Sequence, residues 1–178
     1  MRLVAVLTLA LALSGCGTVP EPDPAAPVPV QVASVEGPFE LTLLLPRSVY
    51  GANEPITGEI RLAVLDGAAR TIGGSGGGPL ATSFAEFGGT RRMEAGWDSS
   101  CGSFEVVPAA PLRDSLSKSG GWSADDPNDA FYEAFFAAPD IRLPPGTWDV
   151  SARASFSEGD CGGPMHEMTT TARILVLP

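Results

Sequence analysis

Histidine and lysine are almost absent from this chain of 178 residues, which contains one of each, His166 and Lys118. A single histidine excludes chemistry that needs a pair of imidazoles, and a single lysine excludes most sites that hold phosphate through lysine. Basic residues are few in general, with 11 Lys and Arg against 21 Asp and Glu and a formal net charge of −10. An acidic chain without a basic patch is not expected to bind nucleic acid.

Charged residues make up only 18% of the chain, whereas glycine (21) and proline (17) are abundant. Residues that favour helices are scarce apart from Ala and Leu, so the composition disfavours a helical bundle. The length predicts one domain with at most a short appendage.

Long hydrophobic runs are also missing. The apolar run at residues 3–13 is shorter than the about 20 residues that a membrane-spanning helix needs. It follows the basic Arg2 and precedes small residues, which is the layout of a secretory signal peptide over residues 1–15.

The residues Leu13-Ser14-Gly15-Cys16 resemble the lipobox of bacterial lipoprotein precursors. The resemblance implies that Cys16 is the lipid attachment site, carries diacylglycerol with palmitate-type chains and becomes the mature N-terminus. Two acyl chains suffice for stable anchoring, so the protein is expected at the extracytoplasmic face of the cell membrane. Gly17 stands where an Asp commonly marks retention at the inner membrane, which leaves open which membrane applies.

Residues 16–34 are predicted to form the lipidated cysteine and a disordered, Pro-rich tether. The segment has no apolar periodicity, and its prolines favour a semi-rigid, extended spacer: Pro20, Pro22, Pro24, Pro27 and Pro29. At about 3.1 Å per residue, such a spacer reaches roughly 55 Å.

Residues 35–178 are predicted to form one β-sandwich domain. Apolar and polar residues alternate over 39–45, 56–64, 147–156 and 170–176, which predicts antiparallel sheets that pack face to face. Asp66-Gly67 predicts a hairpin into a strand over 68–72. The segments 80–87, 91–97 and 103–107 are weaker strand candidates, and 129–137 fits a short strand or a helical turn.

The segments 49–58 (VYGANEPITG) and 143–150 (LPPGTWDV) resemble the first turn with the second strand, and the penultimate strand, of bacterial immunoglobulin-like domains. The resemblance implies an all-β, immunoglobulin-like antiparallel β-sandwich. It also implies that Trp148, two residues after Gly146, covers the edge of the core where tyrosine is usual. A fold of this kind says little about activity.

Beyond Cys16, the chain has two cysteines, Cys101 and Cys161. An exported domain with two cysteines is expected to form one disulfide, here closing a loop of about 60 residues and worth about 4 kcal/mol in the chain-entropy model.

The glycine run at 73–78 contains Gly-x-Ser-x-Gly around Ser75, the pattern of a hydrolase nucleophile elbow. That elbow needs a helix after the serine, but Pro79 and a strand-like segment follow, so we interpret the run as a flexible loop. No catalytic residue and no cofactor are predicted.

Two groups of residues could bind a metal or could have purely structural roles. His166 and Met168 would lie on one side of a strand and could offer imidazole and thioether to copper, or Met168 could fill the edge of the core. The acidic run 125–129, with Glu158 and Asp160, could bind calcium or could be a solvated loop.

Trp122, flanked by glycines and a serine, is predicted to lie exposed as part of a binding surface that includes segments 73–79 and 108–130. The sequence thus favours a non-catalytic binding or accessory module of the cell envelope, anchored to the lipid membrane and meeting an envelope protein as partner. The alternatives are a copper, calcium or small-ligand carrier and a protease-inhibitor-like domain.

Overall fold

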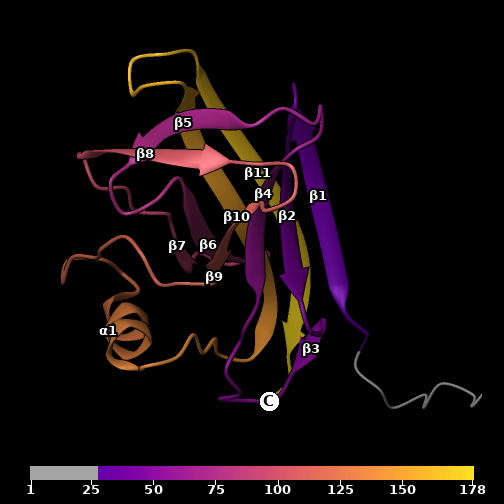
Figure 1. The fold of residues 1–178 in the computed structure, drawn as a ribbon. Coiled ribbons are helices and arrows are strands. Elements are labelled where there is room, and N and C mark those ends of the chain that lie inside the picture. Colours follow the sequence, from indigo (N-terminus) through magenta and orange to yellow (C-terminus); the bar gives the residue numbers. More distant parts are fainter. Residues whose placement is uncertain (1–27) are drawn as a thin grey trace, which may run out of the picture.

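The computed structural model describes residues 28–178 (Figure 1). The predicted signal peptide, Cys16 and residues 17–27 of the tether lie outside the described residues. Strands dominate the described part, which confirms the all-β prediction. Its elements are β1 (Val30–Glu36), β2 (Phe39–Leu45), β3 (Val49–Tyr50), β4 (Glu59–Val64), β5 (Arg70–Ser75), β6 (Leu80–Glu86), β7 (Arg92–Met93), β8 (Cys101–Val106), β9 (Leu112–Ser115), α1 (Asp129–Ala137), β10 (Gly146–Glu158) and β11 (Met165–Val176).

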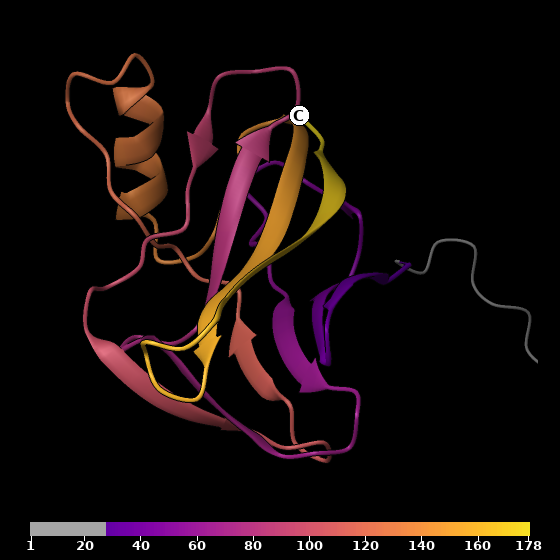
Figure 2. The ribbon, with the colours of Figure 1, turned by 90° about the horizontal axis from the view of Figure 1, so that it is seen from above.

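One sheet has the strand order β1-β2-β4-β9, with antiparallel pairing throughout. The second sheet contains β3, β11 and β10, and the long β10 bonds to two further strands along its other edge. Trp148–Ala154 pair with β6, and Phe156–Glu158 pair with β5. β7 then extends β6, and β8 extends β5. The two sheets face each other in Figure 2, and α1 lies on the opposite side of the molecule from β1 in both views.

The strand order is that of an immunoglobulin-like sandwich, in which strands A, B and E form one sheet and strands G, F and C the other. β2, β4 and β9 take the first three positions, and β11, β10 and β6 take the second three. β1 is an additional strand before A. The short β3 pairs in parallel with β11, whereas the other ladders are antiparallel.

Strict alternation of side chains builds the core, as the sequence predicts. Every second residue of β2 is fully buried, and the same holds for the facing positions of β10 and β11: Phe39, Leu41, Leu43, Leu45, Trp148, Val150, Ala152, Ala154, Phe156, Met168, Ala172, Ile174 and Val176. Because successive strand residues point to opposite faces, the polar residues between them reach the surface.

Trp148 closes the edge of the core, as the resemblance implies. Its side chain is fully buried, and its Nε1 donates a hydrogen bond to the carbonyl oxygen of Pro144 at 2.9 Å. A buried indole needs such a partner for its N–H group. In immunoglobulin domains the corresponding tyrosine hydroxyl also bonds to the backbone a few residues upstream.

The expectations for Asp66-Gly67 and for the start of the domain are wrong. Asp66-Gly67 does not form a hairpin, because β4 pairs with β2 and β9, whereas β5 pairs with β10 and β8 in the other sheet. The turn instead carries the chain between sheets, with Gly67 at φ 78° and the Asp66 carboxylate accepting a hydrogen bond from the Ala68 N–H at 3.1 Å. The folded domain also begins at Val30, inside the predicted tether, because β1 pairs along the length of β2.

The ambiguous segment 129–137 is the helix α1. Its aromatic residues at i, i+4 spacing face the second sheet, where Phe135 packs on Phe84 at 5.9 Å and Phe131 stacks on Trp148 at 5.7 Å, both between ring centroids. Lys118 donates hydrogen bonds to the carbonyl oxygens of Phe135 and Ala138, the last turn of the helix. A cation is favourable there because the C-terminal end of a helix carries partial negative charge.

Candidate functional site

Three loops meet beside the end of β5 and form one continuous surface, here called the loop surface (residues 73–79, 94–101 and 116–122). The Asp98 N–H donates to Ser75 Oγ at 3.1 Å, and the Gly96 N–H donates to Ser119 Oγ at 3.1 Å. The two predicted binding segments, 73–79 and 108–130, are therefore joined, and the joining segment 94–101 is one that the sequence reasoning missed.

A cavity of about 290 Å³ lies at the β5 end of the loop surface, here called the Trp97 hollow. The Trp97 side chain forms one side and is 36% exposed. The rest of the lining is rich in hydroxyl groups and holds one carboxylate: Ser75, Asp98, Ser99, Ser100, Ser155 and Ser157, with Gly73, Gly74, Met165 and the two cysteines completing it. The hollow thus combines an apolar ring face with many hydrogen-bonding groups.

Asp98 is held in place by hydrogen bonds from its own loop. Its carboxylate accepts hydrogen bonds from the Ser100 N–H at 2.7 Å and from the Ser100 hydroxyl. These bonds, together with the Gly76 and Gly77 backbone N–H groups, lower the pKa of Asp98. Since hydrogen bonds to the charged form favour that form, Asp98 is an anionic acceptor at neutral pH.

The glycine run is part of this framework and is not a free loop. Gly73–Ser75 end β5, and the Gly76 N–H donates to the Ser100 carbonyl oxygen at 2.8 Å. A Cβ on Gly76 would lie 2.0 Å from Ser100 Oγ, so a larger residue would push the Ser100 hydroxyl away from Asp98. Ser75 is followed by a turn and then β6, and its Oγ is an acceptor for Asp98, so the strand–helix setting of a hydrolase elbow is not present here.

Cys101 and Cys161 lie at disulfide distance, with Cα atoms 6.1 Å apart, which fits the predicted bond. The bond would join the first residue of β8 to the loop between β10 and β11, directly behind the Trp97 hollow. Gly73 packs against the same loop so closely that a Cβ there would lie 2.6 Å from the Cys161 backbone nitrogen. Packing at Gly73 thus fixes the loop, and the predicted disulfide would add a covalent link.

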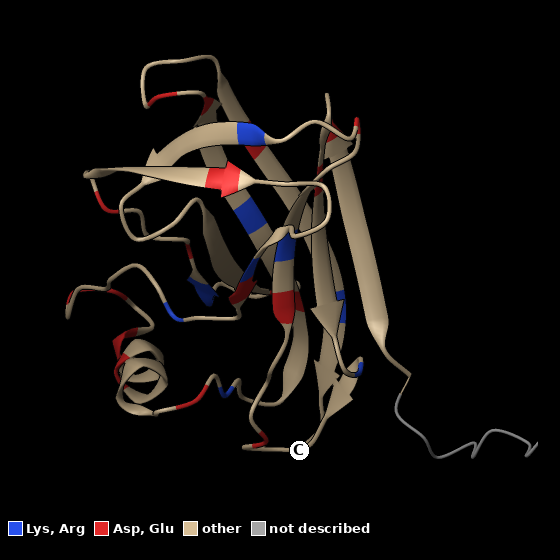
Figure 3. Ribbon diagram, viewed as in Figure 1, with Lys and Arg blue, Asp and Glu red and all other residues tan. Residues whose placement is uncertain are grey.

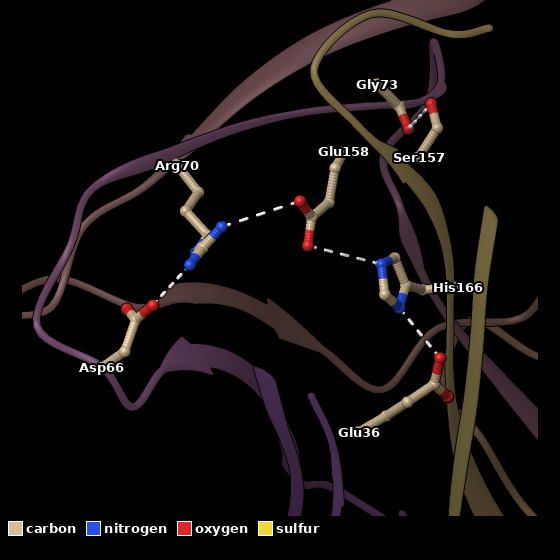
Figure 4. Close-up of polar contacts among 7 residues, drawn as sticks. All are labelled: Glu36, Asp66, Arg70, Gly73, Ser157, Glu158 and His166. Carbon is tan, nitrogen blue, oxygen red and sulfur yellow. Dashed lines mark hydrogen bonds and ion pairs between the residues drawn. The ribbon is translucent and has the colours of Figure 1, made fainter. Parts of the chain in front are cut away.

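His166 lies at a different place, within a chain of charged side chains shown in Figure 4. Its Nδ1 is 2.8 Å from Glu36 Oε1, and its Nε2 is 3.5 Å from Glu158 Oε1. Glu158 also pairs with Arg70 at 3.6 Å, and Arg70 pairs with Asp66. The chain links β1, β5, β10 and β11, so its clearest role is to tie the first strand to the second sheet.

The imidazole of His166 is packed between aromatic rings. It stacks on Phe156 with ring centroids 5.1 Å apart, and its edge contact with Phe39 has a centroid distance of 5.3 Å. Both ring nitrogens face carboxylates, and Met168 is buried in the core. The copper hypothesis for His166 and Met168 stays a prediction, and this geometry does not favour it.

The acidic residues proposed for calcium are not gathered at one point. Asp126 accepts a hydrogen bond from the Asn128 N–H at 2.8 Å, and Asp129 accepts one from the Ala130 N–H at 2.7 Å. Glu158, in contrast, belongs to the His166 chain. Within residues 28–178, no group of three or more His, Cys, Asp or Glu side chains is arranged to hold a metal ion.

Trp122 lies at the far end of the loop surface and is 40% exposed. Its ring stacks on Tyr132 of α1 with centroids 6.5 Å apart and planes 25° apart. Tyr132 is fixed in turn, because its hydroxyl donates to the Arg92 carbonyl oxygen at 2.7 Å. Trp122 thus has the exposure that the sequence predicts, on a support of α1 and β7.

Charges are spread over the molecule, and acidic residues cluster in loops and at the start of α1 (Figure 3). Arginines mostly pair with neighbouring carboxylates, as in Arg173–Asp149 at 2.8 Å and Arg113–Glu59 at 2.7 Å. In the described part of the chain, α1 is too short to cross a bilayer and no other helix qualifies.

Compared with known proteins, the chain matches no family model, and a search of curated proteins finds no significant match.

The sequence predicts a strand over 91–97, which would place Trp97 in a sheet, and it gives no prediction for Asp98 or Ser100. β7 covers only Arg92–Met93. A signal was present: Trp97 is preceded by glycine and followed by Asp and two serines, the same kind of setting that identified Trp122. The His166 chain left no comparable signal, since Glu36 and His166 are 130 residues apart.

Proposed function

We propose that the protein is a lipid-anchored, extracytoplasmic binding module of the cell envelope, without catalytic activity. The lipobox-like sequence at Cys16 supports the anchor. The cysteine pair at disulfide distance supports an oxidising compartment, because disulfides persist outside the cytosol.

The loop surface carries the proposal of a binding role. Most large aromatic side chains of the domain are buried, but Trp97 and Trp122 remain partly exposed on loops held by specific hydrogen bonds. Half-exposed tryptophans are costly to leave in water, and aromatic residues are enriched where proteins bind partners. A rigid sandwich that carries such loops is a common design for recognition.

Metabolic labelling with palmitate tests the anchor. The full-length chain, expressed in a bacterial host, should incorporate label and fractionate with membranes. Cys16→Ser should abolish both, because the thioether needs the cysteine sulfur. Cys101→Ser is the matched control, since it removes a different cysteine and should keep the label. Label that persists in Cys16→Ser, or is absent from the wild type, would contradict the anchored form of the proposal.

A further inference from the structure

We propose that the loop surface binds an uncharged carbohydrate chain, with one sugar ring seated in the Trp97 hollow. This inference rests on the proposed extracytoplasmic binding role and names the class of ligand. It is carried by the lining of the hollow, by the way that lining is held, and by the neighbouring cavities.

The lining of the Trp97 hollow matches a ring that has both apolar and hydroxylated surfaces. The Trp97 indole offers an apolar surface. Ser75, Ser100 and Ser157 already hydrogen-bond within the domain. Ser99, Ser155 and the Asp98 carboxylate are the groups that offer a ligand donors and acceptors beside the indole. An apolar ligand would bury these polar groups without partners, which is costly. A sugar ring matches both the apolar and the polar parts of the lining, because its C–H groups lie on its faces and its hydroxyls lie around its rim.

Charge excludes other ligand classes. Among the described residues that line the hollow, none is basic, and Asp98 is anionic. A phosphate or carboxylate would therefore meet a like charge with no counter-ion. An organic cation could pair with Asp98. A cation is held best by several aromatic faces, however, and Trp97 is the one aromatic residue among the described residues that line this hollow. A neutral polyol fits this lining without an unpaired charge.

The hollow is also pre-organised, which reduces the entropic cost of binding. Asp98 is fixed by Ser100 and Ser75, and Ser100 is fixed by the backbone of Gly76. Cys101, the next residue, lies at disulfide distance from Cys161. The volume of about 290 Å³ lies at the lower end of the range for small-molecule sites, which suits a single ring.

Two further cavities continue from the Trp97 hollow along the loop surface. The next shares Ser75, Trp97 and Asp98 with the hollow and extends to Ser119. The third also contains Ser119 and reaches Trp122 and Tyr132. The second and third cavities are adjacent, because Gly96 of the second packs against Gly120 of the third: a Cβ on Gly96 would lie 2.4 Å from the Gly120 nitrogen. A track with a tryptophan at each end fits a chain of several sugars.

Affinity electrophoresis of the full-length lipidated protein tests the inference. The protein is kept in a detergent without a sugar headgroup, such as lauryldimethylamine oxide, and run through gels that contain glucan, galactan or mannan. Insoluble chitin, a neutral polysaccharide, is tested by co-sedimentation. We expect at least one of these glycans to retain the wild type, because each offers neutral rings in series.

Trp97→Ala should weaken the retaining interaction by about tenfold or more, because it removes the stacking face. Trp122→Ala should weaken binding to the polymer but leave binding of a short fragment unchanged, since Trp122 lies at the far end of the track. Phe87→Ala is the matched control: Phe87 is 56% exposed, contacts Arg173 and does not line the three cavities, so retention should be unchanged.

Four results would overturn the inference: no retention by any of these glycans, retention that Trp97→Ala leaves intact, binding to anionic polymers alone, or quenching of Trp97 fluorescence by tetramethylammonium alone. Trp97→Phe keeps a smaller ring and should give intermediate retention if Trp97→Ala does not fold. Palmitate labelling separates the two proposals, because a labelled protein that ignores glycans loses only the carbohydrate inference.

Discussion

The β10–β11 hairpin and the loop surface are built by different means. The hairpin pairs twelve residues of each strand in continuous register and buries alternate side chains in the core. The loop surface has short strands at most. It is held together by backbone N–H groups that donate to the side chains of Ser75, Ser119 and Asp98, and by the cysteine pair. Apolar burial therefore stabilises the scaffold, whereas polar contacts and one covalent link shape the surface that it presents.

This difference separates stability from recognition. Substitutions in the hairpin should change the free energy of unfolding strongly, and substitutions in the loop surface should change it little while they alter binding. Each of the following predictions compares one region with the other.

The largest expected change in the free energy of unfolding follows from substitution of Trp148. Trp148→Ala should lower the free energy of unfolding by about 3–5 kcal/mol, because it empties a fully buried site and removes the hydrogen bond to Pro144. Trp97→Ala should cost less than about 1 kcal/mol, since Trp97 is partly exposed. Urea denaturation of both variants measures this contrast, and equal losses would show that the loop surface is part of the cooperative core.

The second-largest loss of stability is expected when the cysteine pair is removed. Replacing both Cys101 and Cys161 by Ala should cost about 2–4 kcal/mol, because the cross-link restricts the unfolded chain. Hydrogen exchange should then rise at residues 98–101 and 159–163, next to the link, and stay slow at 148–154 in β10. Uniformly faster exchange would instead mean that the two regions unfold together.

Gly73→Ala should have an intermediate effect, about 1–3 kcal/mol, because the new Cβ would meet the backbone of Asp160 and Cys161 within 3 Å. Gly162→Ala is the matched control in the same loop, since a Cβ there has nothing within 4 Å. Thermal melting of the two variants compares them, and similar midpoints would show that the loop can move away from β5.

The smallest effect concerns pH. The hydrogen bonds from the Arg91 guanidinium lower the pKa of Glu86, so the folded state binds this proton less readily than the unfolded state, where the pKa is about 4.3. The contribution to stability is therefore present above about pH 4.3 and is lost as the pH falls through the folded pKa.

Glu86→Gln should accordingly lower stability by under about 1 kcal/mol at pH 7, and the deficit should shrink at pH 3. Glu133→Gln, at an exposed position of α1, is the matched control for the loss of a carboxylate. Melting temperatures at both pH values test this, and a Glu86→Gln deficit that does not change with pH would contradict the assigned cause.

Local periodicity was a sound guide to the strands of the core. The alternation at 39–45 matches β2, and the alternations at 147–156 and 170–176 lie within β10 and β11. The irregular segments were harder because their residues interact with distant parts of the chain. Segment 91–97 contains only the two-residue β7, and Asp66-Gly67 joins strands of different sheets. A turn signal specifies the local bend but not which strands pair.

The same limit applies to the site. An exposed Trp122 could be predicted from its flanking glycines, and a cysteine pair from the count of cysteines. The Trp97 hollow could not be predicted from the sequence. It forms only where β5, the 98–101 segment and the β10–β11 loop come together in the folded domain. The His166 chain likewise depends on β1 lying beside β11, which no local pattern encodes.

By itself the sequence determined the sandwich class, the alternating core and the identity of Trp148 as its edge residue, because period-two burial is a local property of a strand. Only the tertiary structure decided that the glycine run holds Asp98, that His166 faces two carboxylates, and that Trp97 and Trp122 lie along one surface. These arrangements depend on contacts between residues far apart in the chain, which form only when the two sheets pack.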